Sequence, residues 1–186
     1  MINVLILGKR NPVAKLVTRE LNSRPDVHVT VFSANPQRTR DYVPELAGQN
    51  VIASFLGPMN VDLDFEALFD AIDQVRPPLK RFLMLSHAGV DHEVHGPLEY
   101  PGVSNLKEYF NEQRYAAKVV DESELPYTIL RPVTLVKQPA RRAPQLIEEG
   151  RPVPSGHVSV QSVARVALAV ILKRQYLNQS IAIIDK

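Results

Sequence analysis

Several residues that can bind metal ions or transfer protons stand close together in one stretch of the chain. His87, His92 and His95 could ligate a metal, and Asp91 and Glu93 could act as an acid–base pair. A metal site needs about three converging ligands that are oriented by further hydrogen bonds. Histidines and acids gathered in one polar loop are more typical of a solvated surface, so we expect no metal site here. The sequence contains no Cys, which excludes thiol catalysis, iron–sulfur clusters and disulfides.

The remaining candidate residues follow apolar runs that are typical of buried strands. In parallel α/β sheets, ligands bind at the carboxyl ends of the strands, where the strand order reverses. We therefore expect any site to be built from the five segments that follow these runs, which are Gly8–Asn11, Ser33–Asn35, Phe55–Pro58, Ser86–Gly89 and Arg131–Thr134.

The elements that must position these segments alternate between strand and helix. Asn11 and Pro12 favour a helix start, because Asn is a good N-cap and Pro suits the first helical position. The alternation predicts one α/β domain over residues 1–186, with a doubly wound and mostly parallel sheet. We expect strands at 2–7, 27–32, 51–56, 81–85, 127–130 and 180–184, and helices from 12, at 62–76, 105–123 and 160–173, with a short helix at 144–149.

Composition limits the classes of partner. The chain has 186 residues, with 22 basic and 20 acidic side chains, so nucleic acid is a poor candidate. No apolar run reaches the roughly 18 residues of a membrane span, and the short apolar N-terminus does not resemble a signal peptide. We expect a cytoplasmic protein with no membrane contact. Glycine is scarce, with 8 residues, while proline is frequent, with 15.

Five stretches of sequence together resemble one family. INVLILG with VHVTVFSANP resembles a first βαβ unit, and FLMLSHAGVDHEVHGPLE resembles a fourth strand with its loop. LPYTILRP and VSVQSVARVALAVIL resemble a later strand and a helix near the end of the chain. On these motifs the chain resembles the atypical short-chain dehydrogenases/reductases, in particular the NmrA-like and NAD(P)H-binding proteins. The resemblance implies a Rossmann-like fold that binds NAD or NADP.

The phosphate-binding loop of that family has the pattern G-x-x-G-x-x-G. Only Gly8 matches here, because Asn11 and Ala14 take the second and third glycine positions. Pro12 lacks the N–H that a helix start would offer to a phosphate, and Asn11 can occupy another donor with its own side chain. We therefore expect a weakened anion site at the start of this helix.

Charged residues near the loop bear on the choice of cofactor. Lys9 and Arg10 could contact a pyrophosphate or a 2′-phosphate, or could simply be exposed loop cations. An NAD site normally has an acidic residue at the end of strand two, but Ser33–Asn35 contains none. Since Arg38 and Arg40 lie nearby, we expect NADP rather than NAD, if either cofactor binds, with Ser33 and Arg38 among the cofactor contacts.

One β-α unit of the family is shortened or missing. Only a short polar segment separates Asn35 from Val51, and we expect a loop there with no strand. DYVPELAGQNVIASFLG resembles the piece that follows strand three of the family, so Asp41 takes the place of an acid that faces the adenine. Leu56 and Gly57, at the end of the next strand, are further expected cofactor contacts.

The catalytic residues of the family are Ser, Tyr and Lys, with Tyr-x-x-x-Lys on one helix. The resemblance places Ser86 and Tyr109 at the first two positions, while Gln113 stands where the Lys would be. A neutral Gln cannot lower the pKa of a neighbouring tyrosine as an ammonium would. Arg131 and Pro132 match the segment beside the nicotinamide. The alternative is that Tyr109 is a half-buried helix aromatic and Ser86 a loop residue.

Two functions remain open from the sequence. The first is an NADPH-dependent reductase of a small carbonyl, quinone or flavin, in which Ser86 and Tyr109 polarise the acceptor. The second is a non-catalytic Rossmann-like module, either a nucleotide sensor or a protein partner. Residues 105–123 could pack on the sheet or form a homodimer face.

Overall fold

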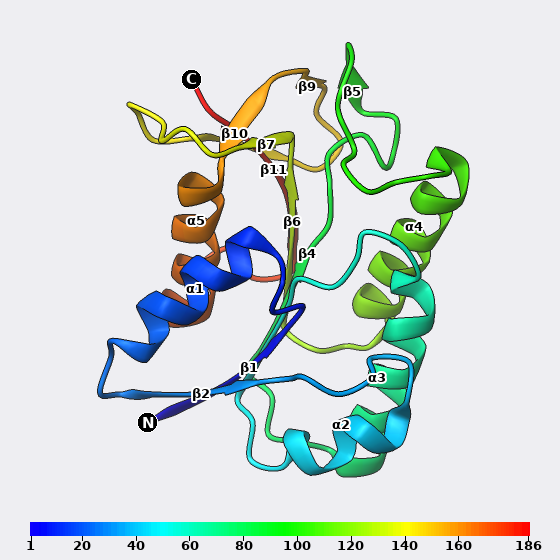
Figure 1. Cartoon of the computed structure of the whole chain (residues 1–186), viewed down its shortest axis with the longest axis vertical. Helices are drawn as coiled ribbons and strands as arrows, with labels where there is room; N and C mark the ends of the chain where they lie inside the picture. The colour runs from blue at the N-terminus through cyan, green and yellow to red at the C-terminus, as the bar shows by residue number, and fades with distance from the viewer.

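A seven-stranded sheet passes through the middle of the molecule, with helices on both faces (Figure 1). The computed structural model describes residues 1–186. The first six strands in the sheet are parallel, and the last one pairs antiparallel at the edge. The spatial order is β2 (Val27–Val31), β1 (Ile2–Leu7), β3 (Val51–Ser54), β4 (Arg81–Leu85), β6 (Tyr127–Pro132), β11 (Gln179–Ile184) and β8 (Gln145–Glu148).

Five helices cover the sheet in two groups. On one face lie α1 (Pro12–Asn22) and α5 (Val160–Lys173), and on the other lie α2 (Thr39–Leu46), α3 (Val61–Val75) and α4 (Leu106–Glu122) (Figure 1). None of these helices combines the length and apolar character needed to cross a lipid bilayer. Two small parallel pairs complete the fold, and they join β7 (Thr134–Val136) to β10 (His157–Ser159) and β5 (Val94–His95) to β9 (Val153–Pro154).

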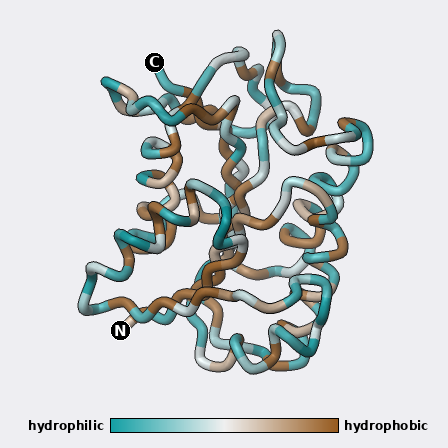
Figure 2. Tube along the Cα trace, viewed as in Figure 1, coloured by the Kyte–Doolittle hydropathy of each residue, from teal (hydrophilic) through white to brown (hydrophobic).

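The sheet separates two hydrophobic cores, and the apolar residues follow the centre of the molecule in Figure 2. Successive side chains of a strand point to opposite faces, and β1 shows this directly. Val4 and Ile6 pack into the core under α1 and α5, while Leu5 and Leu7 pack into the core under α2, α3 and α4. Because both faces are covered, the strand needs apolar residues at each fully buried position, from Val4 to Leu7.

Helix α1 begins where the sequence predicts. The Asn11 side chain accepts a hydrogen bond of 2.8 Å from the backbone N–H of Val13, and Pro12 occupies the first helical position. Val13, Val17 and Leu21 are buried against the sheet and α5. The cap and the apolar spacing therefore act together, as expected for a helix with one buried face.

β2 is the edge strand of the sheet, and no strand pairs with its outer side. This confirms that the third strand of the family pattern is missing. The prediction of a loop between Asn35 and Val51 is partly wrong, since α2 forms over Thr39–Leu46 despite the internal Pro44. Tyr42 stacks on Phe32 with ring centroids 4.3 Å apart, and both rings are buried. This tertiary contact, rather than a periodic apolar pattern, stabilises the short helix.

The helix expected at 144–149 is also wrong. Residues Gln145–Glu148 form β8, which pairs antiparallel with β11. Ile147 is buried in this strand while the next residue, Glu148, is exposed, because successive side chains of a strand point to opposite faces. The edge of β11 supplies the hydrogen-bond partners of β8. A four-residue segment is too short for its apolar periodicity to predict this pairing.

Candidate functional site

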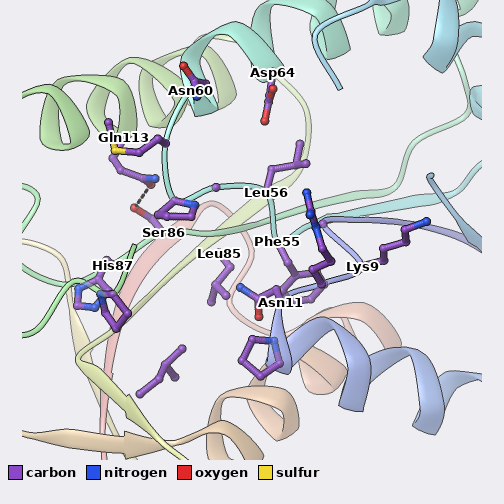
Figure 3. Close-up of a pocket in the computed structure, with 18 of the residues that line it drawn as sticks. Lys9, Asn11, Phe55, Leu56, Asn60, Asp64, Leu85, Ser86, His87 and Gln113 are labelled. Carbon is purple, nitrogen blue, oxygen red and sulfur yellow. Dashed lines mark hydrogen bonds between the residues drawn. The ribbon is translucent and has the colours of Figure 1, made fainter. Parts of the chain in front are cut away.

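A cavity of about 990 Å³ opens at the carboxyl ends of the parallel strands. It lies where the chain crosses from one side of β1 to the other, because β2 and β3 flank β1 in the sheet. This position is the one that ligands favour in open α/β sheets. Figure 3 shows residues from the β1, β3 and β4 ends facing this space together with side chains from α3 and α4. The expected site residues that line it are Gly8, Lys9, Arg10, Asn11, Ser33, Leu56, Gly57, Ser86, Tyr109 and Pro132.

Gly8 joins β1 to α1 in close contact with β3. Its φ is +78°, and a Cβ at this position would lie 2.2 Å from the carbonyl oxygen of Phe55. Any side chain would therefore be strained twice, by the left-handed backbone and by the neighbouring strand. The Gly8 carbonyl also accepts a 2.9 Å hydrogen bond from the N–H of Asn11, which closes the turn into α1.

The first turn of α1 offers few free N–H groups to an anion. Pro12 has none, and the N–H of Val13 is already bonded to the Asn11 side chain. Lys9 and Arg10 are exposed, line the cavity and form no salt bridge with any acidic group. Positive charge near this loop thus comes from two side chains more than from the helix N-terminus.

Ser86 and Tyr109 lie at the β4 end of the cavity. The Ser86 hydroxyl donates a 2.8 Å hydrogen bond to the side-chain oxygen of Gln113, which comes from α4 (Figure 3). Gln113 is 2% exposed and Tyr109, one turn earlier, is 5% exposed. Burial raises the pKa of Tyr109 above its usual range, so the phenol stays protonated. Ser86 and Tyr109 therefore provide a neutral hydroxyl and a neutral phenol at this end of the cavity.

Two further aromatic groups, His87 and Tyr100, border this end of the cavity, and no sequence pattern predicts their contact. The ring centroids of His87 and Tyr100 are 4.5 Å apart, and those of Tyr100 and Tyr109 are 5.7 Å apart. The Nδ1 of His87 lies 2.8 Å from the Ala88 carbonyl, which also accepts from the Tyr100 hydroxyl. Burial lowers the pKa of His87, so its imidazole is neutral at neutral pH. Tyr100 comes from an irregular loop, whose fold no local pattern predicts.

Arg131 does not line the cavity. Its guanidinium forms a buried ion pair with Glu93, and the Arg131 side chain is only 4% exposed. The same carboxylate accepts the N–H groups of Gly89 and Asp91, each at 3.1 Å. Arg131 therefore anchors the loop after β4 rather than facing the space where a cofactor would bind. No group of three His, Asp or Glu side chains could hold a metal ion.

The charged residues around α2 are also arranged differently from the sequence expectation. Arg38 is exposed before the first turn of α2 and does not line the cavity. Asp41 accepts a 3.3 Å hydrogen bond from the N–H of Asn35 and lies 3.7 Å from Arg40, so its carboxylate holds the turn after β2. The carboxylate that does line the cavity is that of Asp64 on α3, which no motif in the sequence indicates.

Several solved structures resemble this chain along nearly its whole length. A short-chain dehydrogenase/reductase from Veillonella parvula has a TM-score of 0.83 at 22% identity, over 99% of this chain and 94% of that one. A structure of such a protein from the same organism in complex with NADP has a TM-score of 0.82, also at 22% identity, over 98% and 94%. ChuY, an anaerobillin reductase from Escherichia coli, has a TM-score of 0.74 at 19% identity, over 98% and 97%.

These structural similarities show the fold alone, since identity is below one quarter in each case. No curated protein matches the sequence. The NAD(P)H-binding family, however, matches residues 6–174, which is nearly the whole chain. With the Rossmann-like sheet and the cavity at its switch point, this match shows that the chain belongs to the NAD(P)H-binding family.

Proposed function

We propose that this protein binds NADPH and reduces a small carbonyl, quinone or flavin. The observation that carries the proposal is the single cavity shared by Gly8 and Lys9 at one end and Ser86 and Tyr109 at the other. Its volume of about 990 Å³ suits a dinucleotide with room for a small acceptor. The NADP complex of the Veillonella protein and the reductase activity in the name of the Escherichia coli protein support the same assignment.

The residues of the cavity fit a phosphorylated dinucleotide by charge. Lys9 and Arg10 provide two unpaired cations, and the end of β2 offers the Ser33 hydroxyl instead of an acid. An acidic residue at that place would accept the ribose 2′-OH of NAD and repel a 2′-phosphate. This arrangement favours NADP in our proposal, with the pyrophosphate held more by side chains than by α1.

The β4 end of the cavity would orient the acceptor. A nicotinamide cofactor supplies a hydride when it is bound. Tyr109 would donate a hydrogen bond to an acceptor oxygen, since its phenol remains protonated. Ser86 would accept or position rather than donate, because its only hydrogen is directed to Gln113. Catalysis would then depend on proximity and orientation more than on proton transfer.

Two departures from the family pattern favour a second function. With Pro12 at the helix start and Gln113 in place of a cation, the protein could bind the nucleotide without turning it over. It would then act as a nucleotide sensor or as a protein-interaction module. The two functions differ in whether bound NADPH is oxidised.

Ligand-dependent unfolding and cofactor oxidation together test the proposal. NADPH at 100 times its Kd should raise the free energy of unfolding by about 2.7 kcal/mol, and NADH should give a smaller effect. Arg10→Ala should weaken the NADPH effect, while Arg19→Ala, which removes an exposed cation on α1, should not. Oxidation of NADPH with a panel of carbonyls, quinones and flavins then identifies a reductase. Stabilisation without oxidation supports the sensor, whereas no stabilisation at millimolar NADPH contradicts both the reductase and the sensor.

A further inference from the structure

The Asp64 carboxyl is the one acidic group on the wall of the cavity. It lies in the first turn of α3, and the residue is only 5% exposed. One carboxyl oxygen, Oδ1, is buried and has no hydrogen-bond partner. Figure 3 shows the side chain directed from α3 toward Leu56 and the interior of the cavity. A buried acceptor without a partner costs free energy, and a ligand that carries a donor would satisfy it.

The neighbours of Asp64 place it at the end of the cavity away from Ser86. Gln37, which follows β2, lies close enough to the carboxyl to stabilise its charged form. The strand order separates this region from Ser86, because β2 lies three strands from β4 in the sheet. Apolar groups also line the cavity at Phe32 and Pro36, which follow β2, and at Leu56, which follows β3. A flat base with one donor edge is the chemistry that this combination of apolar wall and lone acceptor fits.

We propose that Asp64 recognises the 6-amino group of the purine of the dinucleotide, so that it selects adenine over a 6-oxo purine. This inference rests on the proposed function, in which Ser86 marks the nicotinamide end. The purine then lies toward β2. Its amino group is the one group on the base edge that can donate a hydrogen bond to an ionised carboxylate. In NADP the ribose 2′ oxygen carries a phosphate, which offers no donor and is repelled by a carboxylate.

In this chain, the acid that recognises the purine lies on α3, whereas the family pattern places it on α2. Asp41, which the family resemblance places toward the adenine, is bonded to the backbone of Asn35 and does not line the cavity. Asp64 has the opposite properties, since it lines the cavity and keeps a free acceptor. The connection between β2 and β3 holds only α2 in this chain, and α2 packs against α3.

Paired dinucleotides test the inference directly. We would measure the Kd of NADPH and of its hypoxanthine analogue, in which an oxygen replaces the 6-amino group, by calorimetry at pH 8. The wild type should bind NADPH roughly tenfold more tightly or better, as expected for a hydrogen bond to a charged group. Asp64→Asn should reduce this ratio to about threefold or less, because an amide can turn to meet either group. Asp41→Asn, the matched control, should keep the wild-type ratio.

The outcomes separate the inference from the function on which it rests. Equal binding of the two dinucleotides by the wild type overturns the inference and leaves NADPH binding intact. If Asp64→Asn instead changes the ratio of NADH to NADPH affinity but not the amino-to-oxo ratio, the carboxylate contacts the ribose, and the inference is wrong. Failure of the wild type to bind either dinucleotide overturns the proposed function together with the inference. The Tm of each variant without ligand verifies that it is folded.

Discussion

The Ser86 hydroxyl donates its hydrogen to the side-chain oxygen of Gln113, at 2.8 Å, across the space between β4 and α4. Gln113 lies one helical turn after Tyr109, so it is near both polar groups at this end of the cavity. Because a hydroxyl has only one hydrogen, Ser86 cannot donate to an acceptor while this bond exists. The neutral amide also leaves Tyr109 without a cation that would lower its pKa.

Gln113→Lys should therefore raise reductase activity. An ammonium would lower the pKa of Tyr109 and donate to Ser86, which would free the Ser86 hydrogen for an acceptor oxygen. We expect kcat for a carbonyl acceptor to rise roughly tenfold or more, at some cost in Tm because the site is buried. Gln113→Met, similar in length but uncharged, is the control. Equal kcat values for the two variants would contradict this reading of the site.

Gly8→Ala should severely destabilise the protein. The added Cβ would meet the Phe55 carbonyl at 2.2 Å, and the φ of +78° disfavours any side chain. We expect a loss on the order of 3 kcal/mol in the free energy of unfolding, measured by chemical denaturation. Gly150→Ala also has a positive φ but no neighbour within 4 Å, so it separates backbone strain from the clash. Similar losses for both variants would show that the contact with β3 is unimportant.

Asn11→Gly combined with Pro12→Ala should strengthen NADPH binding. The double change restores one N–H at the start of α1 and releases the N–H of Val13 from the Asn11 side chain. With these donors free, we expect the Kd of NADPH to fall roughly tenfold in calorimetry. Ser159→Gly, which removes the cap of α5 instead, should leave the Kd unchanged. Weaker binding by the double variant would refute our interpretation of the loop.

Glu93→Gln should loosen the loop that follows β4. The carboxylate pairs with buried Arg131 and accepts two backbone N–H groups of its own loop. Breaking a buried pair from one side leaves an uncompensated charge, so we expect a loss of about 3 kcal/mol in the free energy of unfolding. Faster hydrogen exchange should appear at Gly89 and Asp91. Glu99→Gln, an exposed change in the same loop, provides the comparison, and unchanged exchange in Glu93→Gln would count against the anchor.

Asp64 should make stability depend on pH. Burial, with smaller contributions from Asp62 and Glu112, raises its pKa from 3.8 to about 6 against the opposing hydrogen bond from Gln37. A raised carboxyl pKa means that the folded state holds the proton more tightly than the unfolded state. The resulting stabilisation is present below about pH 4 and is lost as the pH rises through about 6.

Asp64→Asn should remove this loss. We expect the variant to exceed the wild type by on the order of 2 kcal/mol in the free energy of unfolding at pH 8, and by little at pH 4. Urea denaturation at a series of pH values measures the difference. Asp73→Asn, an exposed change on the same helix, should run parallel to the wild type. A constant offset between Asp64→Asn and the wild type at all pH values would disprove the linkage.

Local patterns were sufficient for the main elements of the fold. Val4–Leu7 are apolar at every position because a central parallel strand is buried on both faces, and this predicts β1 from composition alone. Asn11 and Pro12 act on α1 through bonds within four residues, so the helix start is also a local property. The missing third strand was visible as a short polar connection between Asn35 and Val51.

Contacts between distant segments decided the rest. The segment Gln145–Glu148 is a strand because the edge of β11 pairs with it, and α2 persists because Tyr42 stacks on Phe32. The site depends on such contacts even more. The sequence alone determined that the sheet is Rossmann-like and that a loop with Gly8 follows its first strand. Only the tertiary structure directed Arg131 to Glu93 and Asp64 into the cavity, because the environment of a charged side chain is set by partners that the chain order does not reveal.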